Sequence, residues 1–222
     1  MQIFPKNFLF LISFLLLLIS CTPAMFKGLN RVGADYENNM SLIFPRGIKE
    51  SMVYKTNMKF RDKEFSSLTY INELNDSVFK IVLMTSFGNT LLEAEISKDR
   101  FVVNNVISYL NRKIILNLIE KDWRLVLAGN LNHDKPFLFQ SKYPGQSIFD
   151  FQSGRTNNLY YYKPEEKTIS KIESYKGKLL KTIVTVSSYK NSLPDSISID
   201  HSSLKLKMDM ILLKKVNNDS AE

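Results

Sequence analysis

The sequence predicts a mainly β protein: a curved antiparallel sheet or incomplete β-barrel, covered by one helix at about residues 111–128. Three observations support this fold class. Short segments in which apolar and polar residues alternate recur along most of the chain, which is the two-residue period of half-buried strands. Short polar turns separate these segments, as in antiparallel meanders. The chain also contains fifteen Phe and ten Tyr residues, and aromatic residues favour strands.

The first twenty residues predict a secretory signal. A short polar start with Lys6 precedes an apolar run from Phe8 to Ser20. This run has about 13 residues, whereas a membrane-spanning helix needs about 20. We therefore expect residues 1–20 to be a signal peptide.

Cys21, the only cysteine of the chain, ends the run. The segment Leu18–Cys21 resembles the lipobox of bacterial lipoproteins. That resemblance implies a diacylglycerol on the Cys21 thiol, cleavage before Cys21 and acylation of the new amine. Two or more acyl chains anchor a protein stably in a membrane. The alternatives are an ordinary secretory signal with a chance cysteine and an uncleaved anchor helix.

The residue after Cys21 bears on the destination of the protein. Thr22 stands there, and the lack of an aspartate resembles lipoproteins sorted to the outer membrane. We expect an anchor in the outer membrane, facing the periplasm. The remaining boundaries are a lipidated N-terminus and tether at 21–40, a single β domain at 41–216 and a flexible tail at 217–222.

The formal net charge of +8 invites a nucleic-acid interpretation. The predicted envelope location and the scattered positions of the basic residues argue against it, so we expect no nucleic-acid partner. A solvated basic face is one explanation of the charge. Attraction to anionic lipid headgroups is the other.

The first half of the domain predicts a meander of five strands. Phe87 stands at the tip of a predicted tight turn with Gly88, where it is either tucked back or exposed to a membrane or a partner. The predicted strands are 51–60, 65–74, 77–85, 91–97 and 100–106.

One segment, from Asn111 to Ala128, has the apolar spacing of a helix, with Asn111 as the expected N-cap and Gly129 as the expected C-terminal stop. Ile114, Leu116 and Leu125 fall outside the main apolar stripe. A helix that is apolar on most sides is normally buried on more than one side. We therefore expect it to lie inside the concave face of the sheet.

Residues 130–158 are the least regular part of the domain. Phe137, Phe139, Phe149 and Phe151 form two i, i+2 pairs there, which fit either edge strands or a hydrophobic loop. Strand patterns resume afterwards at 159–163, 168–175, 179–189, 196–200 and 204–214.

The search for catalytic and metal-binding motifs favours a protein that is not an enzyme and needs no cofactor or metal. His133 and His201 stand beside Asp134 and Asp200, a spacing that does not place two metal ligands on one face of an element. Glu93 and Glu95 share one face of a predicted strand. They fit either acid–base chemistry or the solvated face of a sheet, and we favour the second.

Several pieces together resemble the LolA/LolB-like envelope lipoproteins: the lipobox, the meander from Met52 to Val106, the single helix and the strand 204–214. The meander from Phe65 through Gly88 is similar to the opening of such proteins. The resemblance implies about eleven strands around a hydrophobic cavity lidded by helices, and a carrier or receptor of acyl chains. It also implies that Phe87 matches an exposed apolar turn residue used in lipid insertion.

The function expected from this resemblance is binding of acyl chains or lipidated cargo in a cavity, as a step in lipoprotein localisation. The helix around Trp123 would be the lid. The alternative is an assembly lipoprotein that docks a protein partner through a sheet edge or through the aromatic region 137–151. The sequence leaves the oligomeric state open. The candidate cavity residues are Phe79, Ile81, Leu83, Leu92, Ile96, Phe101, Trp123, Met208 and Met210.

Overall fold

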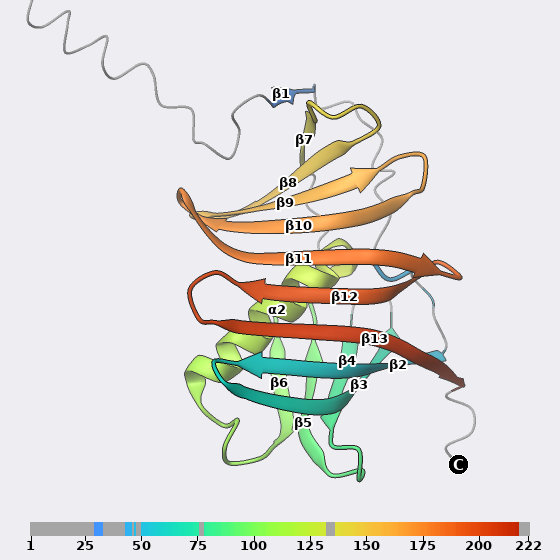
Figure 1. Cartoon of the computed structure of the whole chain (residues 1–222), viewed down its shortest axis with the longest axis vertical. Helices are drawn as coiled ribbons and strands as arrows, with labels where there is room; N and C mark the ends of the chain where they lie inside the picture. Colours follow the sequence, from blue (N-terminus) through green and yellow to red (C-terminus); the bar gives the residue numbers. More distant parts are fainter. Residues whose placement is uncertain are drawn as a thin grey trace, which may run out of the picture.

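The computed structural model describes residues 29–32, 43–45, 47, 50–75, 78–131 and 136–217. The predicted signal peptide, Cys21, most of the tether, His133 and the end of the predicted tail lie outside these residues. The described part consists mainly of one antiparallel sheet of thirteen strands, not closed into a barrel, and one helix, as the sequence predicts (Figure 1).

The first half of the domain forms the predicted meander. Its connections are short, and Arg61 and Asp62 alone make the first turn, so that the two flanking strands are longer than expected. The elements are β2 (Glu50–Phe60), β3 (Lys63–Asn75), β4 (Val78–Met84), β5 (Thr90–Ile96), β6 (Phe101–Val106) and α2 (Lys113–Leu131).

The second half forms another meander. The sequence left residues 137–151 open between strands and a loop, and they fold into two strands. The elements are β7 (Phe137–Gln140), β8 (Ser147–Ser153), β9 (Thr156–Lys163), β10 (Thr168–Lys176), β11 (Leu179–Lys190), β12 (Leu193–His201) and β13 (Leu206–Asn217).

The first strand of the first meander, β2, pairs with the last strand of the second meander, β13, and this pair joins the two meanders. β13 pairs with β2 over almost the whole length of both, with Met210 opposite Thr56. The short strand β1 (Asn30–Arg31) extends the sheet beyond β7. The strand order is therefore β1-β7-β8-β9-β10-β11-β12-β13-β2-β3-β4-β5-β6, with β1 and β6 at the edges.

Burial alternates along the strands as the two-residue pattern predicts. In β4, Phe79, Ile81 and Leu83 are buried, whereas the residues between them are partly exposed. Their partners across the strand pair, Ile96, Ala94 and Leu92, are buried as well. Each of these Phe, Ile and Leu side chains contributes about 1.5–3 kcal/mol when it is removed from water. We call the face that carries these residues the inner face of the sheet.

Helix α2 covers the inner face. In Figure 1 it runs obliquely across the strands, and its side chains contact both halves of the sheet. Trp123, Val126 and Leu127 are buried in the main hydrophobic core with residues of β2, β4 and β8–β13. The predicted place of the helix inside the curved sheet is confirmed. No helix in the described part of the chain has the length and apolar character needed to cross a bilayer.

The expected helix ends need correction. Asn111 is not the N-cap, because the carbonyl of Arg112 accepts the amide hydrogens of Ile115 and Leu116 and thereby starts the helix. Gly129 does not stop it, since the helix continues to Leu131. One glycine inside a helix costs about 1 kcal/mol, which the neighbouring turns can offset. Among the apolar residues outside the main stripe, Leu125 is buried but Ile114 is 73% exposed.

Other boundaries also differ from the prediction. The last strand begins at Leu206 because Lys205 has a positive φ of 46° and belongs to the preceding turn. The strand continues to Asn217, because pairing with β2 extends to Glu50. The pattern predicts ten strands and the resemblance implies about eleven. The described sheet has thirteen, because residues 130–158 supply β7 and β8 and the predicted tether supplies β1 in addition to the ten.

Candidate functional site

The interface between α2 and the inner face of the sheet gathers the predicted cavity residues. Phe79, Ile81, Leu83, Leu92, Ile96, Trp123 and Met210 are buried. Phe101 and Met208 are partly buried and pack against the same core. Leu83 and Leu92 belong to a second, smaller cluster with Ala94, and Phe101 and Ile119 pack against both clusters, so that they connect the two.

Two pockets on the described surface lie elsewhere. One, of about 400 Å³, lies between the turns that follow β7 and β9 and includes Tyr143 and Tyr161. The other, of about 430 Å³, is formed by the turns after β2 and β12 and includes Arg61 and Lys205. The nine predicted cavity residues line neither pocket. Burial and contacts place them between helix and sheet, packed against one another.

Polar groups hold α2 over this apolar surface. The Arg124 guanidinium donates from Nη1 to the carbonyl oxygens of Ser97 and Lys98, at 2.9 and 2.8 Å, in the turn between β5 and β6. In the other half of the sheet, the Tyr160 hydroxyl of β9 donates to the Leu125 carbonyl at 2.8 Å. These bonds tie the middle of the helix to both halves of the sheet.

A third tie is a buried polar chain of Asp122, His201 and Thr182. His201 Nε2 lies 3.0 Å from Asp122 Oδ2, and His201 Nδ1 lies 3.2 Å from Thr182 Oγ1. The side chains of Asp122 and His201 are each 4% exposed. Burial raises the pKa of Asp122, and the hydrogen bond and charge of His201 oppose that rise. Asp122 Oδ1 has no hydrogen-bond partner among the described residues.

Sequence reasoning missed these buried polar contacts because Asp122 and His201 are 79 residues apart. Asp200, the sequence neighbour of His201, is exposed and has no part in the chain. A signal was nevertheless present. Asp122 is three residues after Ile119 and four before Val126, so that it falls on the apolar stripe of the helix, where a carboxylate needs a buried partner.

Exposed apolar side chains gather at one end of the sheet. Phe87 is 92% exposed at the tip of the β4–β5 turn, where Gly88 adopts a φ of 87°. The amide of Ile107 donates to the Leu91 carbonyl at 3.1 Å, which brings the segment between β6 and α2 to the same end. Tyr109 of that segment and Ile114 in the first turn of α2 are more than half exposed. We call Phe87, Ile107, Tyr109 and Ile114 the apolar rim.

Cations accompany the apolar rim. Arg112 and Lys113 are exposed beside it, and the Arg112 guanidinium lies 5.7 Å from the centre of the Tyr109 ring. Aromatic and cationic side chains together suit the interface between a bilayer and water. The expectation that Phe87 is either tucked back or exposed is resolved as exposed.

The paired carboxylates Glu93 and Glu95 lie on the outer face of the sheet and have separate partners. Glu93 forms an ion pair with Lys80 at 2.7 Å. Glu95 accepts a hydrogen bond from Asn104 at 3.0 Å. This arrangement is that of a solvated sheet face.

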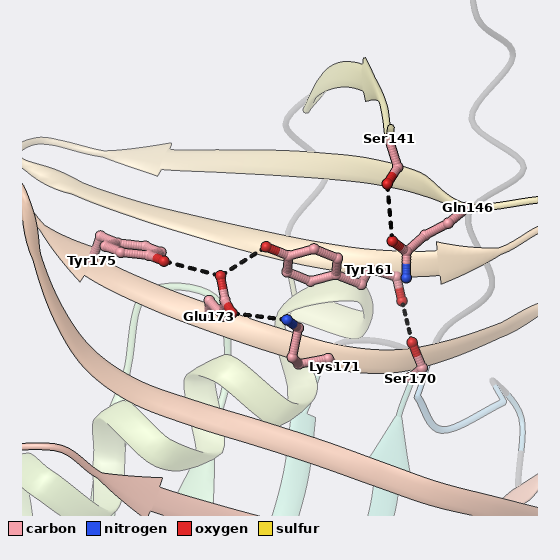
Figure 2. A network of polar contacts seen from close by, with 7 residues as sticks. All are labelled: Ser141, Gln146, Tyr161, Ser170, Lys171, Glu173 and Tyr175. Atoms are coloured by element: carbon pink, nitrogen blue, oxygen red, sulfur yellow. Dashed lines mark hydrogen bonds and ion pairs between the residues drawn. The ribbon is translucent and has the colours of Figure 1, made fainter. Parts of the chain in front are cut away.

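The outer face also carries a polar network around Glu173 (Figure 2). Glu173 accepts from the Tyr161 hydroxyl at 2.7 Å, the Tyr175 hydroxyl at 3.0 Å and Lys171 Nζ at 2.8 Å. Burial acts to raise the pKa of Glu173, but the bonds from Lys171 and Tyr161 outweigh it and leave the pKa below its usual value. Burial, with the Glu173 charge, raises the pKa of Tyr175 to about 12. The network braces β9 against β10.

The aromatic region 137–151 is mostly unavailable to a partner. Phe149 and Phe151 are buried, and each packs against a tyrosine of β9. Phe137 is partly exposed, with the Arg31 guanidinium 4.1 Å from its ring centre. Of the docking surfaces considered from the sequence, the sheet edge at β6 is the more accessible.

No protein-family model and no curated protein matches the sequence. Solved structures resemble the fold. A LolA superfamily protein from Nitrosomonas europaea superposes with a TM-score of 0.58 at 10% identity, covering 82% of this chain and 91% of that one. A domain from Vibrio parahaemolyticus, described as an outer membrane lipoprotein-sorting protein domain, gives 0.43 at 13% identity, covering 79% and 88%. A DUF1329 family protein from Desulfovibrio piger gives 0.45 at 7% identity, covering 78% and 86%.

Proposed function

We propose that this chain, which has a LolA/LolB-like fold, is a lipid-anchored cell-envelope protein that holds an acyl chain or lipidated cargo between α2 and the inner face of the sheet. The observation that carries the proposal is the continuous apolar inner face of an open sheet, covered by one helix. One scaffold can host several functions, so the fold by itself is not sufficient. The proposal rests on the apolar side chains that line the interface between helix and sheet.

In this proposal α2 is a lid. An acyl chain enters when the helix moves away from the sheet, and the chain then takes the place of contacts between Trp123 and the strands. Burial of each CH₂ group contributes about 0.8 kcal/mol, which offsets the contacts given up by the helix. The hydrogen bonds made by Arg124, Tyr160 and Asp122 hold the helix against the sheet when no acyl chain is bound. No covalent step and no cofactor are required.

The apolar rim gives this carrier a route to the membrane. Phe87 at the turn tip and Ile114 at the start of α2 would insert among the headgroups, while Arg112 and Lys113 face anionic lipid. Acylation of Cys21 would keep the domain at the outer membrane. Because the rim includes the first turn of α2, contact with a bilayer would act directly on the lid.

Native mass spectrometry tests the proposal. The mature chain with Cys21→Ala is incubated with phospholipid vesicles, repurified and measured without denaturation. We expect one bound acyl-containing molecule per chain. A protein that carries no lipid mass after any preparation would overturn the proposal.

A matched pair of variants locates the bound molecule. Ala94 is fully buried on the inner face, whereas Val82, on the neighbouring strand, is on the outer face. Ala94→Leu adds side-chain volume where the chain would lie, so that less lipid is retained. Val82→Leu places the same side chain on the outer face, with a smaller gain in volume, and leaves the retained lipid unchanged.

A second candidate function is favoured by the exposed edge of the sheet. β6 is an edge strand, and its Val102 is 47% exposed. An extended segment of a partner protein could add to this edge by strand pairing. Stoichiometric pull-down of an envelope protein, lost on Asn104→Pro, would favour this function over the carrier.

A further inference from the structure

The Asp122 carboxylate is an anomaly in the apolar interface. Its Oδ2 is bonded to His201, but its Oδ1 has no partner among the described residues, and the side chain is 4% exposed. Nearly all buried polar atoms in proteins have a hydrogen-bond partner, so each exception needs an explanation. A buried carboxylate oxygen without a donor costs more than most, because it carries charge.

The neighbours of Asp122 hold it in this position. Thr182 contacts Nδ1 of His201, and His201 Nε2 contacts Oδ2 of Asp122. Rotation of the carboxylate to find another donor would break the contact with His201. The second oxygen thus remains as a fixed acceptor in the interface between α2 and the sheet.

The position of this acceptor suits the polar end of an amphiphile. Asp122 directly precedes Trp123, the largest buried side chain of the lid. Its partner His201 is the last residue of β12, and the turn that follows, Ser202–Lys205, is exposed. The polar chain therefore lies where the apolar interior approaches one end of the sheet. A bound acyl chain that extends beneath Trp123 would place its polar end close to Asp122.

We propose that Asp122 Oδ1 selects acyl ligands with a hydrogen-bond donor, an amide N–H or a hydroxyl, at the start of the chain. This inference rests on the proposed function. A donor would satisfy the orphan oxygen. A free fatty acid would bring a second negative charge to the same place, which is unfavourable in a weakly solvated interior. A methyl ester brings no charge and no donor.

Binding of three ligands with the same chain tests the selection: dodecanoyl ethanolamide, methyl dodecanoate and dodecanoate. Each displaces an acyl probe brominated at mid-chain, which quenches Trp123, the only tryptophan of the chain. At pH 8 we expect the ethanolamide to bind about 10-fold more tightly than the ester, as one satisfied hydrogen bond of a buried charged group provides. The carboxylate binds most weakly.

Two variants assign the selection to Asp122. Asp122→Leu removes the acceptor, so that the ethanolamide and the ester bind equally. Asp122→Asn removes the charge while keeping the size, and it raises the affinity for dodecanoate towards that of the ester. Circular dichroism establishes whether each variant is folded. If Asp122→Leu does not fold, the affinity of Asp122→Asn for dodecanoate decides whether Asp122 is responsible. Asp150→Asn is the control, because Asp150 is buried on β8 with both oxygens already bonded.

The outcomes separate this inference from the proposed function. If the three ligands bind with equal affinity, a donor is not selected and the inference fails, whereas the carrier function stands. The same conclusion follows if the preference persists in both Asp122 variants. If neither the probe nor any ligand binds, the carrier function fails, and the inference fails with it.

Discussion

Replacement of His201 by Leu tests the buried polar chain that ties α2 to β12. The variant keeps a side chain of similar size but leaves the Asp122 carboxylate without its partner, in a place where the side chain is 4% exposed. Removal of the hydrogen-bond partner of a buried polar group costs about 1–3 kcal/mol, and more when that group is charged. We expect the free energy of unfolding of His201→Leu to fall by an amount in this range at pH 8.

The pH dependence has a definite sign. Burial raises the pKa of Asp122 in the folded protein, so that the folded state binds a proton more readily than the unfolded state. Between the unfolded and the folded pKa of this group, stability therefore falls as pH rises. Loss of His201 removes the interactions that lower this pKa. The destabilisation by His201→Leu should thus be smaller at pH 5 than at pH 8.

Urea unfolding at the two pH values, followed by the fluorescence of Trp123 and by circular dichroism, measures these differences. Asp200→Asn is the control, because Asp200 is the exposed neighbour of His201 in β12. Exposed substitutions usually change stability by about 0.5 kcal/mol or less. If His201→Leu costs less than the control, or costs the same at both pH values, the account of the buried chain is refuted.

The remaining predictions concern the inner face, the apolar rim and the outer face. Ile81→Ala, on the inner face, should lower the free energy of unfolding in urea by about 2–5 kcal/mol, whereas Ile114→Ala, on the exposed side of α2, should lower it by about 0.5 kcal/mol or less. Equal effects would contradict the assignment of the inner face. Phe87→Ser should weaken binding of the unlipidated chain to anionic vesicles several-fold without a change in stability, and Tyr143→Ser, at a turn away from the rim, should not; an unchanged partition of Phe87→Ser would argue against the rim. Glu173→Gln removes a charge that helps to raise the pKa of Tyr175 to about 12, so NMR titration of labelled tyrosine should show a lower value, and an unchanged value would mean that burial alone is responsible.

Local pattern was sufficient to predict much of the fold. The alternation in β4 follows from side chains that point to opposite faces of a strand, so Phe79, Ile81 and Leu83 could be placed together on the buried face before any pairing was known. The helical spacing around Trp123 predicted a buried helix for the same kind of reason. The exact ends were less predictable, because Arg112 became the N-cap through backbone geometry that residue type does not specify.

Contacts between distant segments could not be predicted. Pairing of β13 with β2, and the contact of His201 with Asp122, depend on how the two meanders meet, and no local pattern records that. Only part of the candidate site could therefore be predicted from the sequence. Its apolar part follows from periodicity, whereas its polar part joins residues 79 positions apart.

The central claim is that an acyl chain lies between Trp123 and the sheet. Trp123 is 2% exposed and is the only tryptophan of the chain, so its fluorescence reports on this interface alone. The most direct measurement is quenching by an acyl chain brominated at mid-chain, compared with a Trp123→Phe/Tyr143→Trp variant whose tryptophan is at an exposed turn. We predict saturable quenching of Trp123 and none of the tryptophan at position 143. Equal quenching of both, or of neither, would contradict the account.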